Sequence, residues 1–202
     1  MHDVEKNGFL KRVGVIVAAL LMLAVLPGCA TAIKATTTQN PPPKEAFSDF
    51  GRIELKPVVF KQGLDGDMAG LAKIDQNLRL TLASSLEKWN QRPANGRTLV
   101  IEPVIEDMRF EHGATRVLLG PLAGSSGVLM VVTIHDADGV VVAKPEFFQR
   151  ATAMAAGFTV GVLDNLMLTR VGKLAGNYVI ANYEHAEGGP TGADDKAVAK
   201  PL

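Results

Sequence analysis

The chain has 202 residues, with 21 basic and 21 acidic side chains, one cysteine and an apolar content of 47%. This length predicts one domain with flexible ends, and the apolar content is sufficient for a hydrophobic core. The balanced charge excludes the strongly basic character of many nucleic-acid-binding proteins, so we expect no nucleic-acid partner. A single cysteine has no second thiol for a disulfide, so an exported domain would depend on its core.

Residues 1–28 are arranged like a secretory signal peptide. Three basic residues (Lys6, Lys11 and Arg12) precede an uninterrupted apolar run from Val13 to Leu26. A helix needs about 20 apolar residues to cross a bilayer, so this run is short for a permanent anchor and suits a signal peptide. Removing residues 1–28 leaves a mature chain with a net charge near −1, because the removed part holds three basic and two acidic side chains.

The tetrapeptide Leu26-Pro27-Gly28-Cys29 closes this run and resembles a bacterial lipobox. We therefore expect cleavage before Cys29 and attachment of acyl chains, palmitate among them, to Cys29. Each buried methylene contributes about 0.8 kcal/mol, so more than one chain makes release from the membrane negligible. The alternatives are an ordinary secretory signal and a short N-terminal membrane anchor.

Ala30 follows the cysteine. Lipoproteins of Gram-negative bacteria that stay in the inner membrane often carry Asp at this position. By that resemblance, Ala30 favours the outer membrane, with the protein facing the periplasm, over the inner membrane.

Composition predicts the limits of the domain. Residues 29–46 hold the lipidated cysteine, several threonines and three consecutive prolines, which predict a flexible tether. About 16 flexible residues would reach ~20–25 Å, and a polyproline ligand is the alternative. A single domain is expected over residues 47–183. Residues 184–202 are polar and rich in glycine, and they predict a disordered tail.

Hydrophobic periodicity predicts two long amphipathic helices, Gly70–Gln91 and Val160–Asn182. In the first helix, Leu71, Ile74, Leu78, Leu82, Leu86 and Trp89 recur every three or four residues. This stripe predicts a core face, with a partner-binding face as the alternative, and Trp89 is expected to anchor its sheet-facing end. Charged side chains interrupt the second helix, so a second membrane span is not expected.

Strands are expected at residues 53–60, 97–110, 128–135, 140–144 and 146–152. Asp136-Ala137-Asp138-Gly139 between two of them predicts a hairpin turn. Pro57 and Pro103 predict an edge position or a bulge. Together these patterns predict an α+β fold: a small antiparallel or mixed β-sheet with two long amphipathic helices packed on one face, in the order β-α-β-β-β-α.

Candidate catalytic and metal-binding motifs are missing from the sequence. There is no HExxH pattern and no Cys/His cluster, and Asp136–Gly139 lacks the further ligands of a calcium loop. Gly124-Ser125-Ser126-Gly127 is not a GxSxG elbow, and a strand follows where a nucleophile elbow needs a helix. We therefore expect no catalytic residue, no metal and no cofactor.

The segment Glu111–Gly127 has the most unusual composition, with glycines on both sides of a short apolar run. It predicts a conformationally demanding loop with close backbone packing, or alternatively a loop that contacts a partner. The residues of this possible interaction loop are Gly120, Pro121, Gly124, Ser125, Ser126 and Gly127.

Four features together resemble an uncharacterised family of bacterial lipoproteins built on a domain of unknown function. They are the lipobox at Cys29, the loop GPLAGSSG, the hairpin VVTIHDADGVVVA and the glycine-dotted last helix ending in NYVIANY. The resemblance covers Phe47 to Tyr183, and it provides no activity or catalytic residue that could be carried over to this chain. The element order also resembles the small α+β domains of envelope assembly proteins, such as the N-terminal domain of the Tol-Pal beta-propeller protein and curli-secretion lipoproteins, at the level of fold alone.

These observations predict a lipid-anchored envelope lipoprotein that works as an assembly or scaffold protein with envelope protein partners, and not as an enzyme. The protein would bind the membrane through the acyl chains on Cys29. The alternative is a periplasmic module that binds a small ligand or lipid, suggested by the apolar, glycine-rich segment Ala153–Gly161.

Overall fold

The computed structural model describes residues 33–110, 125–152 and 162–193. Contacts divide the chain into two compact units, Met1–Ala30 and Thr31–Leu202, and all described residues belong to the second unit. Its elements in chain order are β1 (Gln39–Asn40), the 3-10 helix η1 (Phe47–Asp49), β2 (Arg52–Leu55), β3 (Val59–Phe60), α2 (Met68–Asn90), β4 (Thr98–Arg109), β5 (Ser125–Asp136), β6 (Val141–Ala143), β7 (Glu146–Thr152), α4 (Val162–Ala181), β8 (Gly189–Pro190) and β9 (Gly192–Ala193).

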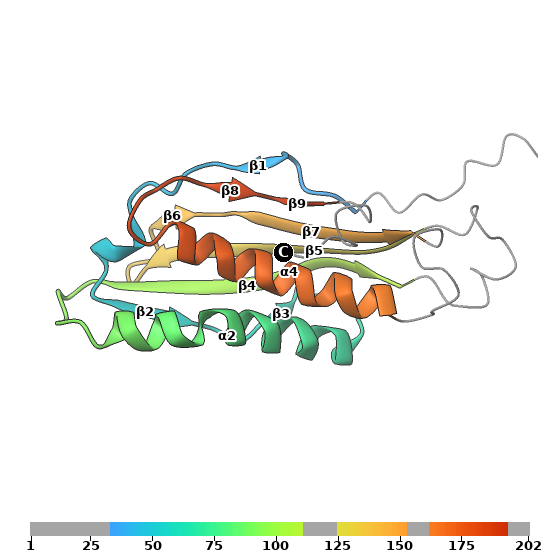
Figure 1. The fold of residues 1–202 in the computed structure, drawn as a ribbon, viewed down its shortest axis with the longest axis horizontal. Helices are drawn as coiled ribbons and strands as arrows, with labels where there is room; N and C mark the ends of the chain where they lie inside the picture. Colours follow the sequence, from blue (N-terminus) through green and yellow to red (C-terminus); the bar gives the residue numbers. More distant parts are fainter. Residues whose placement is uncertain (1–32, 111–124, 153–161, 194–202) are drawn as a thin grey trace, which may run out of the picture. The chain divides into compact units, whose positions relative to one another are not determined.

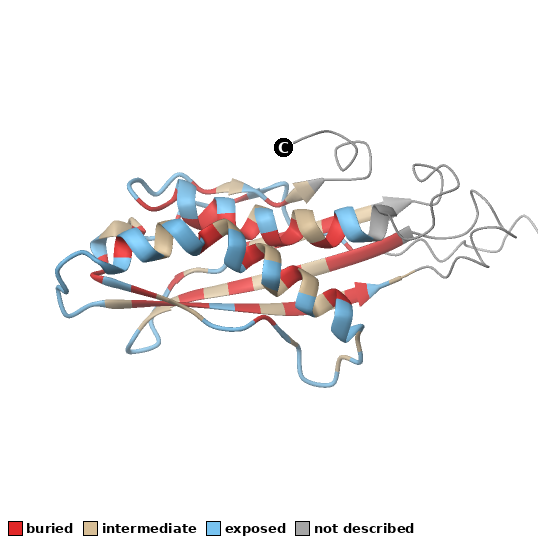
Figure 2. Ribbon diagram, turned by 60° about the horizontal axis from the view of Figure 1, so that its bottom comes forward, coloured by how far each residue is buried: buried red, intermediate tan, exposed pale blue. Residues whose placement is uncertain are grey.

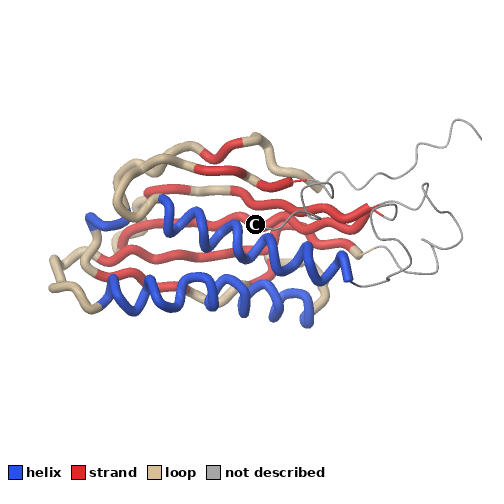
Figure 3. Tube along the Cα trace, in the orientation of Figure 1, coloured by secondary structure: helices blue, strands red, loops and turns tan. Residues whose placement is uncertain are grey.

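The described strands form one mixed sheet and one two-stranded pair, β1 with β8 (Figure 1). The main sheet has the order β2-β4-β5-β7-β9, with β3 also beside β4 and β6 also beside β5. β5 is antiparallel to β4, β6 and β7, whereas β2 and β3 are parallel to β4. Helices α2 and α4 lie side by side on one face of the sheet (Figure 3). The predicted α+β class is confirmed.

Helix α2 begins at Met68 because Asp67 caps it. The Asp67 carboxylate accepts hydrogen bonds from the backbone N–H groups of Ala69 and Gly70, at 3.0 and 3.1 Å. This start lies two residues before the predicted one. The predicted stripe faces the core: Ile74, Leu78, Leu82 and Trp89 are buried, and Leu71 and Leu86 are partly buried against them.

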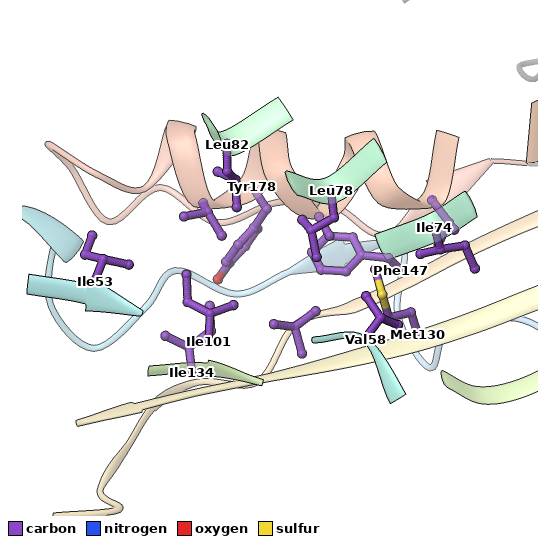
Figure 4. Packing of buried hydrophobic residues seen from close by; sticks show 14 of the residues in the cluster. Ile53, Val58, Ile74, Leu78, Leu82, Ile101, Met130, Ile134, Phe147 and Tyr178 are labelled. Carbon is purple, nitrogen blue, oxygen red and sulfur yellow. The ribbon is translucent and has the colours of Figure 1, made fainter. Parts of the chain in front are cut away.

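The core fills the space between the two helices and the sheet (Figure 4). Buried and exposed residues alternate along the helices, and the buried side faces the sheet (Figure 2). On the strands, alternate side chains point to opposite faces, which explains why every second residue of β5 from Val128 to Ile134 is buried. The largest fully buried side chains include Phe47, Ile74, Leu78, Leu82, Leu99, Ile101, Ile105, Met130, Ile134, Phe147 and Met167. Burial of each stabilises the fold by about 1.5–3 kcal/mol.

Pro103 lies inside the sheet, on β4, and not at an edge. The carbonyl of Ile101 accepts a hydrogen bond from the N–H of Lys56, just after β2, at 2.9 Å. The carbonyl of Ile105 accepts one from the N–H of Lys61, just after β3, at 3.0 Å. Pro103, midway between these two isoleucines, therefore turns its nitrogen toward the gap where β2 has ended and β3 has not begun. The missing N–H of proline removes no ladder bond there. The bulge expected near Pro103 lies instead between Ile105 and Asp107.

The predicted hairpin turn is confirmed between β5 and β6. The Asp136 side chain accepts hydrogen bonds from the N–H groups of Asp138 and Val140, at 3.0 and 2.8 Å. Gly139 has a φ of 82°, which glycine adopts without steric penalty. After β6, strand β7 continues along the same edge of β5.

Two glycines of α4 allow the helices to approach closely. A Cβ atom at Gly172 would lie 2.8 Å from the carbonyl oxygen of Ile74 and 3.1 Å from the nitrogen of Leu78. At Gly176 it would lie 2.6 Å from the Cγ2 atom of Thr81. Gly172 and Gly176, for which the sequence predicted no role, thus form part of the surface against which α2 packs.

The predicted tether differs from the structure from Ile33 onward. Ile33 and Ala35 are buried, and β1 pairs with β8. The buried amide of Asn40 donates hydrogen bonds to the carbonyls of Glu146 and Pro190, at 2.9 and 3.4 Å, and accepts one from the N–H of Glu146 at 2.8 Å. Residues 33–46 are therefore part of the domain and not a free linker, because one amide side chain fixes them to two distant segments.

The predicted tail also differs from the structure, because residues 184–193 pack on the domain. The fully buried Asn182 amide donates to the carbonyls of Tyr178 and Gly188, at 2.8 and 2.9 Å. It accepts from the N–H groups of Glu187 and Gly188, at 2.8 and 2.7 Å. This side chain supplies hydrogen-bond partners to backbone groups that have none in the helix once α4 ends. It thereby holds the turn that precedes β8 and β9.

We expect Asn182→Ala to destabilise the domain by about 2–3 kcal/mol, because it leaves several buried backbone groups without partners. Urea unfolding followed by circular dichroism measures the loss. The matched control is Gln62→Ala, which removes an exposed amide and should change stability by less than about 0.5 kcal/mol. Equal losses for both variants would contradict the role given to Asn182.

We expect Gly172→Ala to destabilise by about 1–3 kcal/mol even though alanine favours helices, because the added methyl group overpacks the contact with α2. Lys173→Ala, which places alanine at the neighbouring exposed position, is the control and should be close to neutral. Thermal unfolding of both variants tests this, and a stabilised Gly172→Ala would show that the helices are not in close contact.

Candidate functional site

The residues singled out in the sequence are only partly within the described structure. Cys29, Gly120, Pro121 and Gly124 lie outside the described residues, as does the segment 153–161. Ser125, Ser126 and Gly127 do not form a loop but begin strand β5, opposite β7. Ser126 is fully buried, so its side chain is not a contact surface. The close packing predicted for this segment is present at Gly127, where an added Cβ atom would lie 3.1 Å from Cβ of Ile33.

A cleft of about 530 Å³ lies where the end of α2, the helix η1 and the segment after α4 meet. Its residues are Ser48, Lys88, Trp89, Gln91, Arg92, Tyr183 and Glu184. Sequence reasoning missed this cleft, because its walls come from three segments far apart in the chain.

Stacked aromatic rings form the apolar wall of the cleft. The ring centroids of Trp89 and Tyr183 are 4.0 Å apart, and their planes differ by 8°. Both residues are more than nine-tenths buried. Such pairs contribute about 0.5–1.5 kcal/mol beyond their buried area. Trp89 thus closes the end of the helix stripe, as expected, but its partner is the segment after α4 and not the sheet.

Arg92 forms the polar wall. Its Nη1 atom donates hydrogen bonds to the Tyr183 hydroxyl and, at 3.4 Å, to the carbonyl of Ser48. The guanidinium carbon lies 5.8 Å from the centroid of the Tyr183 ring. Arg92 therefore joins the end of α2 to two other segments, which gives it a structural role as well as a position on the cleft.

The charges around the cleft are mixed. Lys88 lies in the last turn of α2, where a cation is favoured by the helix dipole. Lys88 and Arg92 are basic, and Glu184 is acidic. Ser48 has no histidine beside it among the residues that line the cleft. The arrangement suits binding of a small polar or aromatic group and offers no nucleophile paired with a base.

Two titratable side chains with displaced pKa values support the fold. Burial raises the pKa of Tyr178 to about 12, so its hydroxyl remains a donor, to the carbonyl of Pro41 at 3.2 Å. Burial acts to raise the pKa of Asp75, but hydrogen bonds from Arg79 and from the N–H of Val58 outweigh it and lower that pKa. Tyr178 holds the N-terminal segment, and Asp75 holds the approach to β3.

The face of the sheet opposite the helices is half-exposed. Val104, Leu129, Val131 and Phe148 are neighbours in register on β4, β5 and β7, and each is partly buried. These positions alternate with the fully buried residues that face the helices, so they form a second, weaker apolar surface. Such surfaces are candidates for protein contact.

Residues 33–110, 125–152 and 162–193, which the structure describes, contain neither a cluster of metal-ligating side chains nor a membrane-spanning helix. No group of three His, Cys, Asp or Glu side chains there could hold a metal ion. The Nε2 atom of His135 lies 3.5 Å from a carboxylate oxygen of Glu102, as a pair across two strands. In the same ranges, neither helix has the length and apolar character that crossing a bilayer requires.

No family model matches the chain, and no curated protein matches it. Two solved structures of the PelC dodecamer from Paraburkholderia phytofirmans are similar, at 12% and 14% sequence identity with TM-scores of 0.37 and 0.36. Each comparison covers 67% of this chain and 92% of the PelC chain. A likeness of this size carries no argument about the fold or the function.

Two substitutions of Tyr183 should distinguish how much its stacking on Trp89 and its hydrogen bond with Arg92 each contribute to stability. Tyr183→Phe keeps the stacking on Trp89 and loses the bond to Arg92, so we expect a loss of about 1 kcal/mol. Tyr183→Ala loses both and should cost about 3–5 kcal/mol. Trp89 is the only tryptophan, so its fluorescence reports the cleft directly, and its emission should move to longer wavelength in Tyr183→Ala alone. Unchanged emission in that variant would contradict the stacked arrangement.

Proposed function

We propose that the protein is a cell-envelope lipoprotein, anchored by acyl chains on Cys29 to the outer membrane and facing the periplasm. The observation that carries this proposal is the order of features before Cys29: basic residues, then the apolar run that starts at Val13, then Leu26-Pro27-Gly28-Cys29. The position of the described domain supports it, because the domain follows Cys29 in the chain, as the exported part of a lipoprotein does. No membrane-crossing helix is then required for attachment.

We further propose that the domain acts as a scaffold that binds other envelope proteins, and not as an enzyme. The half-exposed apolar surface of Val104, Leu129, Val131 and Phe148 supports this reading. The cleft supports it too, since its lining offers no nucleophile paired with a base. The contacts would be made on the sheet face and around the cleft.

Binding of a small ligand is the second candidate function, favoured by the cleft itself. An open cleft of about 530 Å³ that is lined by two aromatic, two basic and one acidic side chain, among others, can receive a small ring or an anionic group. Titration of the protein with envelope glycan fragments and lipids, followed by Trp89 fluorescence, tests it. Saturable quenching that is lost in Arg92→Met would favour this function over the scaffold, and flat titrations would count against it.

The variant Cys29→Ser tests the proposed anchor. We expect wild-type protein to incorporate labelled palmitate and to fractionate with the outer membrane. Cys29→Ser should incorporate none and should keep its signal peptide, because lipoprotein processing needs the modified cysteine. Thermal unfolding of the domain should be the same in both forms, because the substitution changes none of the described residues. Palmitate incorporation by the serine form would refute the assignment.

Crosslinking in living cells tests the scaffold. A tagged wild-type protein should capture a defined set of envelope proteins, and the set should be lost when Cys29→Ser removes the anchor. Capture of no stoichiometric partner by the lipidated protein would overturn the scaffold and favour the ligand-binding function.

A further inference from the structure

The chain is fixed on the domain from Ile33 onward. The Ile33 side chain is 3% exposed, and the next residue but one, Ala35, is 7% exposed. The N–H and hydroxyl groups of Thr36 donate hydrogen bonds to the Glu146 carboxylate, at 2.6 and 3.0 Å. Asn40 then bonds to β7 and to Pro190 of β8. Within the described residues, the N-terminal segment is therefore held on the fold from its first residue.

This attachment limits the distance between the domain and an acylated Cys29, so the inference rests on the proposed lipoprotein function. Four peptide steps join Cys29 to Ile33. A fully extended chain covers at most about 3.6 Å per residue, or about 14 Å for four steps. This distance is less than half of the ~30 Å thickness of the hydrocarbon core of a bilayer. Because the acyl chains keep Cys29 at the membrane surface, the surface around Ile33 must stay close to the headgroup layer.

Ile33 lies on the helix-free face of the sheet, at one end of β5. It covers Gly127, which stands opposite Arg109 of β4 and opposite Arg150 of β7. Residues directly opposite each other in antiparallel strands project from the same face. The two arginines therefore flank the position that Ile33 covers.

The charges around Ile33 favour phosphate groups. We define the anchor-end patch as Ile33, Lys34, Asp107, Arg109, Gly127 and Arg150. Three of these six residues are basic and one is acidic, so the patch has an excess of two positive charges. The Arg109 side chain is 65% exposed, although its Nε atom lies 3.3 Å from Asp107. A guanidinium group offers several donors in one plane, which suits the oxygens of a phosphate.

We infer that the anchor-end patch lies on the headgroup layer of the membrane that holds Cys29, with lipid phosphates contacting Lys34 and Arg109. The acyl chains hold the protein on the membrane, and the basic side chains set its orientation. Along α2, Trp89 is 21 residues from Met68, or about 32 Å at 1.5 Å per residue. The cleft at the far end of that helix therefore points away from the membrane, toward other envelope proteins.

Single-cysteine labelling of the full lipidated protein tests the orientation, since an acylated Cys29 leaves no other thiol. Met68→Cys labels an exposed site near the patch, because Gly70 of the same helix turn lies against Met108. Ala137→Cys labels the exposed hairpin turn at the other end of β5. Each labelled protein is reconstituted into phosphatidylethanolamine–phosphatidylglycerol vesicles that carry a quencher on the headgroups. We expect several-fold stronger quenching at residue 68 than at residue 137.

A pair of matched arginine substitutions tests the phosphate contact. Arg109 and Arg52 both lie on the helix-free face, with side chains 65% and 64% exposed, and each pairs through Nε with a carboxylate two residues away. Near an anionic membrane surface, each basic side chain raises the binding constant for that surface by about fivefold. Arg109→Gln should therefore lower the ratio of quenching at residue 68 to that at residue 137, whereas Arg52→Gln should leave it unchanged.

The outcomes separate this inference from the proposed function. Mass spectrometry that finds no acyl chain on Cys29 overturns the proposed function and the inference with it. Acylated protein with equal quenching at residues 68 and 137 overturns the orientation alone. Equal ratios in Arg109→Gln and Arg52→Gln overturn the phosphate contact. An orientation that appears in native membranes but not in lipid vesicles assigns the patch to a protein partner and overturns the lipid assignment.

Discussion

Every layer of the domain depends on the antiparallel pairing of β4 with β5. The pairing runs from Leu99 opposite Asp136 to Arg109 opposite Gly127. Because side chains alternate across a strand, this one register places the apolar side chains of both strands under α2 and α4. The same register supplies both edges on which the other strands are built, β2 and β3 beside β4, and β6 and β7 beside β5. A slip of one residue would turn the core face toward solvent.

Elements whose signal is local could be predicted from the sequence. The period of Ile74, Leu78 and Leu82 marks the buried face of α2, and the aspartates and Gly139 mark the hairpin turn. The limits of the domain could not be predicted, because they depend on single amide side chains. Asn40 bonds to a carbonyl 106 residues away, and no periodicity in the surrounding threonines and prolines indicates such a partner.

The candidate sites show the same division. The glycines and serines before Gly127 have a loop-like composition, but Ser125 to Gly127 pair with β7, and Gly127 also pairs with β4, so these residues begin a central strand. Composition indicates which backbone conformations a segment can adopt, whereas pairing with adjacent strands determines which of them it adopts. The cleft was missed for a related reason. Trp89 reads as one more apolar residue of a stripe, and only the fold brings Tyr183 to its ring.

The contacts of the N-terminal segment have a consequence for the order of folding. The hydroxyl of Thr191 donates to the carbonyl of Thr37 across 154 residues of chain, and β1 can pair only once β8 exists. Closing so long a loop is slow compared with forming a helix or a hairpin. The strand β1, which is the first described strand of the chain, is thus the last to pair. Until residues 189–191 are in place, Gln39 and Asn40 have no strand partner in β8, so the pairing of β1 completes the domain late.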